Sequence, residues 1–144
     1  MKLLKPIPPE CVVTLPYGPY PPALVARFGR SFHDGIDFAL PHSENAYYIP
    51  IRAAADGTIL HTGFNPHAGY FVVISHITPQ NLALTVYLHL ASQTVFRNSV
   101  VLAGDIIGHM GNTGDSTDIH LHFGAAIVTL SELRFFDPAQ HFIN

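Results

Sequence analysis

Two histidines at a spacing of two lie near the end of the chain, in the segment IHLHFG. Side chains alternate between the two faces of a β-strand, so Ile119, Leu121 and Phe123 would share one face. His120 and His122 would share the other. The apolar face suits a hydrophobic core, which leaves both imidazole rings on the opposite surface. A solvated strand face would give the same pattern, and a metal site or catalytic site is the alternative.

A second polar pair lies in the segment FHDGIDF, where His33 and Asp37 are four residues apart. An even spacing puts both side chains on one face of a strand, and a helix would also bring them together. Gly35 and its bulky neighbours Phe32 and Ile36 favour an extended chain. Zn²⁺ accepts imidazole nitrogen and carboxylate oxygen, although a turn histidine beside a capping aspartate would give the same sequence.

A third histidine lies in the strand-like segment TVYLHL. Val86, Leu88 and Leu90 alternate there with two polar or aromatic residues. The alternation predicts that Tyr87 and His89 both face away from the core. A single histidine in such a place is usually structural, so His89 gains significance only from the other two segments.

The three segments together form a more specific pattern than any one of them. The chain has one cysteine, Cys11, so a metal site must use histidine, aspartate or glutamate. Two histidines and one carboxylate would leave the fourth position of a Zn²⁺ ion to water, as in catalytic zinc sites. The two remaining histidines could accept a proton from that water and stabilise an oxyanion.

Short strands must position these residues. From about residue 47 onward, runs rich in Val, Ile, Leu, Thr and Tyr are separated by Gly, Pro, Asn and Asp, which predicts an all-β, sandwich or barrel-like fold. Helix is scarce: one short turn could end at Gly29, and another could begin at Pro138 with Asp137 as its N-cap. We expect a proline-rich lead-in over residues 1–22 and one domain over residues 23–144.

Composition narrows the class of protein. The chain has 144 residues, 48% of them apolar, and a formal net charge of −3 without a basic block. These values suit one folded domain and argue against nucleic acid as the main partner. No run approaches the roughly 20 apolar residues of a membrane-spanning helix. The N-terminus is interrupted by prolines too early to resemble a signal peptide.

The motifs resemble those of the LytM/lysostaphin-type zinc endopeptidases, which cut peptidoglycan. The family pattern is an H-x-x-x-D pair, a later Y-x-H-L, and a glycine turn before H-x-H. FHDGIDF, YLHL and GHMGNTGDSTDIHLHF match its order and spacing. The resemblance covers roughly residues 24–143. The chain departs from it at Asp118, where glycine is common, at Gly124, and near Asn98, where a glycine is missing.

The resemblance implies a role for each residue. His33, Asp37 and His122 would bind Zn²⁺, and His89 and His120 would form an unliganded catalytic pair, with the general base left open between them. It also implies a small, mostly antiparallel β domain with the site in a groove. The substrate would be a peptide bond in peptidoglycan cross-bridges or stem peptides, hydrolysed by a metal-activated water. Such a substrate implies an extracytoplasmic location.

Two other functions are compatible with parts of the pattern. A non-catalytic relative could bind the cell wall as a regulatory module, although such relatives usually lack some ligands. A sugar-transport phosphocarrier also has a His-x-Gly-Ile-Asp motif, but that function leaves His120 and His122 unexplained. We interpret His76, at the end of VVISH, as structural.

Overall fold

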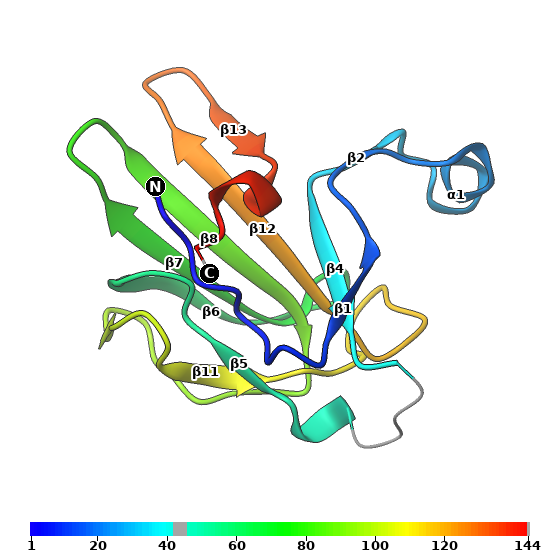
Figure 1. Ribbon diagram of the computed structural model, residues 1–144, viewed down its shortest axis with the longest axis horizontal. Helices are drawn as coiled ribbons and strands as arrows, with labels where there is room; N and C mark the ends of the chain where they lie inside the picture. Colours follow the sequence, from blue (N-terminus) through cyan, green and yellow to red (C-terminus); the bar gives the residue numbers. More distant parts are fainter. Residues whose placement is uncertain (42–45, 144) are drawn as a thin grey trace.

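The computed structural model describes residues 1–41 and 46–143, and strands dominate this part of the chain (Figure 1). The largest sheet has eight strands, all paired antiparallel. Its order is β1 (Val12–Leu15), β4 (Gly35–Ala39), β12 (Leu121–Val128), β8 (Leu82–Leu90), β7 (Gly69–Ile77), β6 (Gly57–Asn65) and β10 (Val100–Val101). The eighth strand, β13 (Leu133–Phe136), pairs with the second half of β12.

Two smaller sheets complete the strands. One contains β5 (Pro50–Arg52), β11 (Ile106–His109) and β9 (Ser92–Gln93), and the other pairs β2 (Gly18–Pro19) with β3 (Phe32–His33). The prediction of an all-β, mostly antiparallel fold is confirmed. In the described residues the large sheet is open, because its terminal strands β1 and β10 do not pair with each other. The sequence patterns did not predict β1 or β13, which are four residues long and largely exposed.

The helices are short, as expected. Helix α1 (Pro22–Phe28) ends at Gly29, which adopts a left-handed conformation with φ of 65°. The 3₁₀-helix η2 (Pro138–His141) begins after Asp137, whose side chain accepts a hydrogen bond from the backbone N–H of Ala139. A third turn, η1, spans Ala46–Tyr48. Among the described residues, these helices are all too short to cross a membrane.

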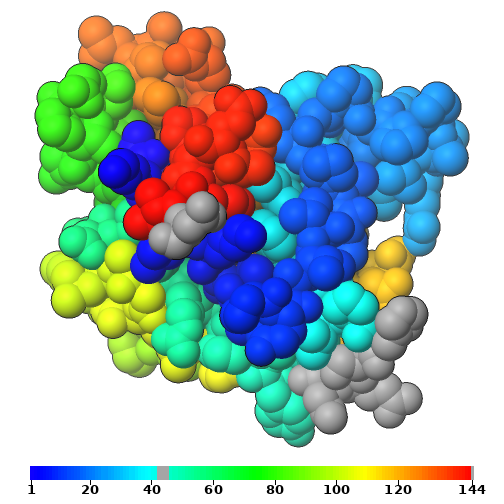
Figure 2. All heavy atoms as spheres, in the orientation of Figure 1, coloured from blue at the N-terminus to red at the C-terminus, as the bar shows by residue number. Residues whose placement is uncertain are grey.

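The N-terminal segment contributes to the hydrophobic core. Leu3, Ile7 and Cys11 are buried and pack in the same cluster as residues of β4, β7, β8 and β12. The backbone N–H of Leu3 donates to the carbonyl of His141, and Leu3 forms a β-bridge with Phe142. Figure 2 accordingly shows the N-terminal residues beside those of the C-terminus. The division of the chain at residue 22 stays a prediction.

A buried chain of hydrogen bonds contains His76. The ring Nδ1–H donates to the carbonyl oxygen of Asp56 at 2.7 Å, and Nε2 lies 2.8 Å from the Thr85 hydroxyl. That hydroxyl lies 3.1 Å from the Tyr87 hydroxyl, which accepts from the backbone N–H of Ala54. Burial lowers the pKa of His76, so the ring is neutral and its Nε2 accepts a hydrogen bond. These contacts support a structural role.

This burial predicts how stability depends on pH. The pKa of His76 is lower in the folded chain than in the unfolded chain, where it is about 6.5. The unfolded state therefore binds an additional proton below that pH, and the free energy of unfolding falls as the pH drops from 7 toward 5. The contribution of one such group is at most ~1.4 kcal/mol per pH unit.

We expect His76→Gln to flatten this dependence, measured by urea unfolding in chelator between pH 5 and 7.5. His61→Gln is the control, because His61 is exposed on the neighbouring strand β6. The interpretation fails if His76→Gln retains the slope of the parent protein.

Candidate metal centre and active site

Three polar side chains from separate strands meet on the groove side of the large sheet. Asp37 on β4 and His122 on β12 are direct partners in the antiparallel register. Their neighbours Phe38, Leu121 and Phe123 point to the opposite face and are buried. The alternation predicted for the IHLHFG segment is therefore confirmed, because an antiparallel pair presents partner side chains on one face.

His33 reaches the same place from β3. Its Nδ1–H donates to the backbone carbonyl of Pro16 at 2.9 Å, and the residue is 3% exposed. A neutral ring with the proton on Nδ1 carries its lone pair on Nε2. The β2–β3 pair places His33 opposite Gly18, and the nearby Pro16 carbonyl fixes which ring nitrogen faces the cluster.

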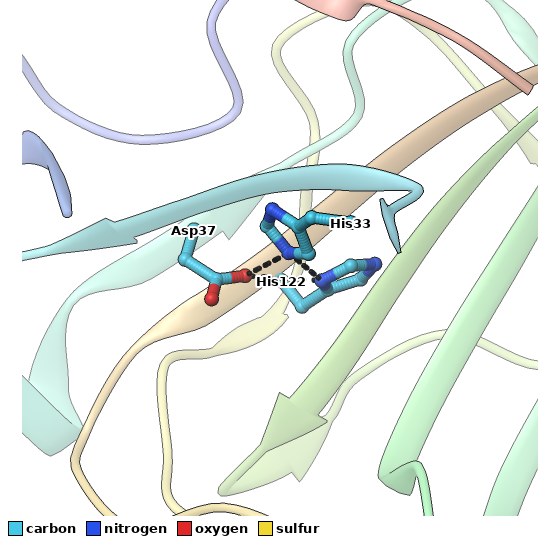
Figure 3. Close-up of side chains that lie close together, drawn as sticks. All are labelled: His33, Asp37 and His122. Carbon is cyan, nitrogen blue, oxygen red and sulfur yellow. Dashed lines mark hydrogen bonds and ion pairs between the residues drawn. The ribbon is translucent and has the colours of Figure 1, made fainter. Parts of the chain in front are cut away.

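The three side chains form a small triangle (Figure 3). His33 Nε2 lies 3.1 Å from Asp37 Oδ1 and 3.0 Å from His122 Nδ1. His122 Nδ1 lies 3.0 Å from the same carboxylate oxygen. Among the described residues, this is the only group of three or more His, Cys, Asp or Glu side chains placed to hold a metal ion.

The cluster fits a divalent cation. His33 Nε2, His122 Nδ1 and Asp37 Oδ1 all lie within 3.1 Å of one another, and three such atoms are held together only by protons or a cation between them. Two imidazole nitrogens and one carboxylate oxygen are ligands that Zn²⁺ accepts, with bonds of about 2.0–2.2 Å. An ion at those distances from all three atoms fits a triangle of this size. His33, Asp37 and His122 are therefore the residues that would hold it.

The charged groups of the cluster shift one another's pKa values. Burial disfavours the charged form of His122, but the carboxylates of Asp34 and Asp37 outweigh it and raise the pKa to about 9. Burial also opposes ionisation of Asp37, yet hydrogen bonds from His122 and His33 hold its pKa well below the usual range. A metal must displace the His122 proton from Nδ1, so binding strengthens as the pH rises.

Two further histidines line the same groove and are oriented by backbone carbonyls. His89 Nδ1–H donates to the carbonyl of Thr113 at 2.8 Å, and His120 Nδ1–H donates to that of Asp118 at 2.8 Å. Their ring centroids are 4.9 Å apart, and His120 Nε2 lies 3.9 Å from Asp37 Oδ2. Both Nε2 atoms are therefore left free to exchange protons.

The position of Tyr87 corrects the alternation predicted for β8. Tyr87 does not face away from the core: it is fully buried. The groove is lined instead by Val86 and Leu88, and His89 joins them out of phase. His89 has a φ of 63°, and the β7–β8 pairing shifts its register just before Leu90. The strand alternates regularly up to Leu88, in the opposite phase to the prediction, and the irregularity then turns His89 into the groove beside Leu88.

The groove has a volume of about 1660 Å³ and combines apolar and charged walls. Tyr20 lines it, and the Tyr20 ring centroid lies 5.5 Å from that of His33. At the rim, exposed His67 and Asp115 form an ion pair at 2.6 Å. The sequence patterns did not single out Asp34, whose Oδ1 lies 3.4 Å from His122 Nε2.

The fold and the cluster define a class of protein: an antiparallel β domain with a two-histidine, one-carboxylate centre in an open groove. Residues 31–131 match the model of Peptidase family M23. The chain therefore belongs to Peptidase family M23, and the resemblance to LytM and lysostaphin is confirmed.

Several relatives support this assignment. The chain is 40% identical over 91 residues to the peptidoglycan DD-endopeptidase ShyA of Vibrio cholerae, covering 63% of this chain and 19% of ShyA. It is 32% identical over 122 residues to lysostaphin of Staphylococcus simulans, covering 85% of this chain and 23% of lysostaphin. The chain thus spans about a fifth of the length of these relatives.

Solved structures share the fold. The catalytic domain of lysostaphin from Staphylococcus simulans superposes with a TM-score of 0.69 at 30% identity, covering 90% of each chain. A zinc-containing peptidase from Vibrio cholerae gives a TM-score of 0.74 at 27% identity, covering 94% of this chain and 39% of that one. These similarities extend over nearly the whole chain.

The triangle predicts which substitutions abolish metal binding. Asp37→Ala and His122→Ala each leave two of three ligands, so we expect bound zinc to fall from about one per chain to near zero. Metal content after dialysis, measured by plasma mass spectrometry, checks this. His67→Ala is the matched control, because His67 lines the same groove outside the triangle. Full zinc content in Asp37→Ala would show that the ligands lie elsewhere.

Proposed function

We propose that this domain is a zinc-dependent endopeptidase that hydrolyses peptide bonds in peptidoglycan cross-bridges or stem peptides. The observation that carries the proposal is the convergence of three ligand atoms within 3.1 Å of one another beside two unliganded histidines. Zinc bound by His33, Asp37 and His122 would supply Lewis-acid chemistry and an activated water. The membership of a peptidase family supports this assignment.

The unliganded histidines supply the proton chemistry. Each is anchored through Nδ1–H to a backbone carbonyl, so each can accept a proton only at Nε2. Burial lowers the pKa of His89 to about 4, which keeps its ring neutral and able to accept a proton near neutral pH. A ring that has gained a proton at Nε2 becomes a donor. We propose that one of His89 and His120 takes the proton of the nucleophile and that the other stabilises the oxyanion.

The substrate class rests on the relatives and on the groove. ShyA is named a peptidoglycan DD-endopeptidase, and relatives from Neisseria are named DD-carboxypeptidase/endopeptidases. The groove is open and long enough to be lined both by α1 residues and by the loop before β12. These features support an extended peptide as the substrate. Because peptidoglycan lies outside the cytoplasmic membrane, we also propose an extracytoplasmic place of action.

The alternative functions are less well supported. A sugar-transport phosphocarrier is disfavoured by the match to a peptidase family. A wall-binding module without activity would not need His89 and His120 aligned beside the triangle. Binding to cell walls that survives chelation, without release of peptides, would favour that module over an enzyme.

The proposed roles separate metal binding from turnover. We expect His89→Ala and His120→Ala to retain zinc but to lower kcat by about 100-fold or more, because each removes a group that transfers or stabilises charge. Hydrolysis of a soluble stem peptide and zinc content are measured on the same preparations. His67→Ala should stay within a few-fold of the parent protein. Loss of zinc from a folded His89→Ala protein would contradict the roles.

The function itself is tested by digestion of purified peptidoglycans of several chemotypes. Mass spectrometry of the released fragments identifies the bond that is cut. We expect fragments with zinc, none with chelator, and recovery when zinc is restored. Intact walls and intact glycine and stem peptides after incubation with the zinc-loaded protein would overturn the proposal.

A further inference from the structure

The carboxylate of Asp34 faces the side of His122 that points away from the ligand triangle. We propose that Asp34 is a positioning residue that orients the His122 ring for metal binding. This inference rests on the proposed role of His122 as a ligand. It concerns a residue between His33 and Gly35 that the ligand pattern does not include.

The geometry gives the two nitrogens of His122 different partners. Nδ1 lies 3.0 Å from both Asp37 Oδ1 and His33 Nε2, inside the triangle. Nε2 lies 3.4 Å from Asp34 Oδ1, on the other side of the ring. A carboxylate this close to Nε2 favours the proton on that nitrogen, which leaves the lone pair of a neutral ring on Nδ1, where a metal would bind. Carboxylates that hold metal-binding histidines in this way fix the tautomer and raise the basicity of the ligand.

The backbone of Gly35, next to Asp34, holds the His122 ring in this orientation. A Cβ atom built on Gly35 would lie 2.7 Å from both Cε1 and Nε2 of His122 and 2.7 Å from the carbonyl oxygen of Phe123. The ring therefore packs directly on the Gly35 backbone, and Asp34 meets its edge. The His122 side chain is 11% exposed, whereas the Asp34 side chain is 43% exposed. Asp34 can thus change without leaving a cavity in the core.

Asp34 is not placed to be a fourth ligand. Its nearest ring contact is Nε2, while the triangle uses Nδ1 of the same imidazole. Asp34 is also absent from the group of side chains whose ligand atoms converge. Asp34 contacts the His122 ring at the nitrogen outside the triangle. Removing the Asp34 carboxylate should therefore weaken metal binding rather than abolish it.

The test measures the zinc dissociation constant by competition with a chromophoric chelator. We expect Asp34→Ala to raise this constant 10- to 100-fold, the range typical of lost outer contacts to metal ligands. Asp34→Asn keeps an oxygen acceptor without the charge, so we expect a smaller, several-fold rise. If Asp34→Ala does not fold, the zinc dissociation constant of Asp34→Asn provides the test.

Asp115→Ala is the matched control, because it removes a carboxylate from the same groove that pairs with a histidine outside the triangle. We expect its zinc affinity to stay within about twofold of the parent protein. An equal loss in Asp115→Ala would attribute the effect to overall charge and overturn the inference, as would unchanged affinity in both Asp34 variants.

A second readout follows the imidazole itself. Long-range ¹H–¹⁵N spectra of the zinc-loaded protein should show His122 protonated at Nε2, with that proton exchanging faster in Asp34→Ala. If the parent protein binds no zinc, the proposed function and this inference both fail. If it binds zinc but His122 carries its proton on Nδ1, only the inference fails.

Discussion

Two imidazole nitrogens and one carboxylate oxygen lie about 3 Å apart in a largely buried place, and the surrounding structure is arranged to keep them there. Such a cluster is costly to bury unless each atom has a partner. The partners come from three directions: Asp37 faces His122 across the β4–β12 register, Pro16 accepts from His33, and Asp34 faces the outer edge of His122. The large sheet therefore fixes two ligands, and the separate β2–β3 pair fixes the third.

The histidines beside the cluster depend on irregular backbone. His89 adopts a left-handed conformation that a side chain other than glycine rarely takes, and hydrogen bonds at its backbone N–H and at its ring hold it there. The ring bond goes to Thr113, in the loop before β12. That loop packs so closely on the β6–β7 turn that a Cβ on Gly69 would overlap Thr113. The β6–β7 turn, the irregularity in β8 and the loop before β12 together fix the orientation of the His89 ring.

Membership of Peptidase family M23 agrees with this arrangement. The five side chains all fall between residues 33 and 122, inside the matched region of residues 31–131. The relatives are several times longer than this chain, yet the matched part contains the triangle and the two further histidines. The groove around them also uses residues outside the matched part, among them Tyr20 and Phe135. The side chains that would carry the proposed chemistry therefore all lie within the part of the chain that defines the family.

The sequence by itself determined the fold class and the set of candidate residues. Period-two alternation and turn residues are local signals, so they predicted the longer β strands and the shared face of His120 and His122 correctly. The same rule gave the wrong phase at Tyr87, which lies in the core. His89 lies in the groove as predicted, but through a backbone irregularity that leaves no clear mark in the order of residue types. Only the tertiary structure decided that Tyr87 joins the core and that Asp34 meets His122, since strand register and backbone irregularity depend on contacts between residues far apart in the chain.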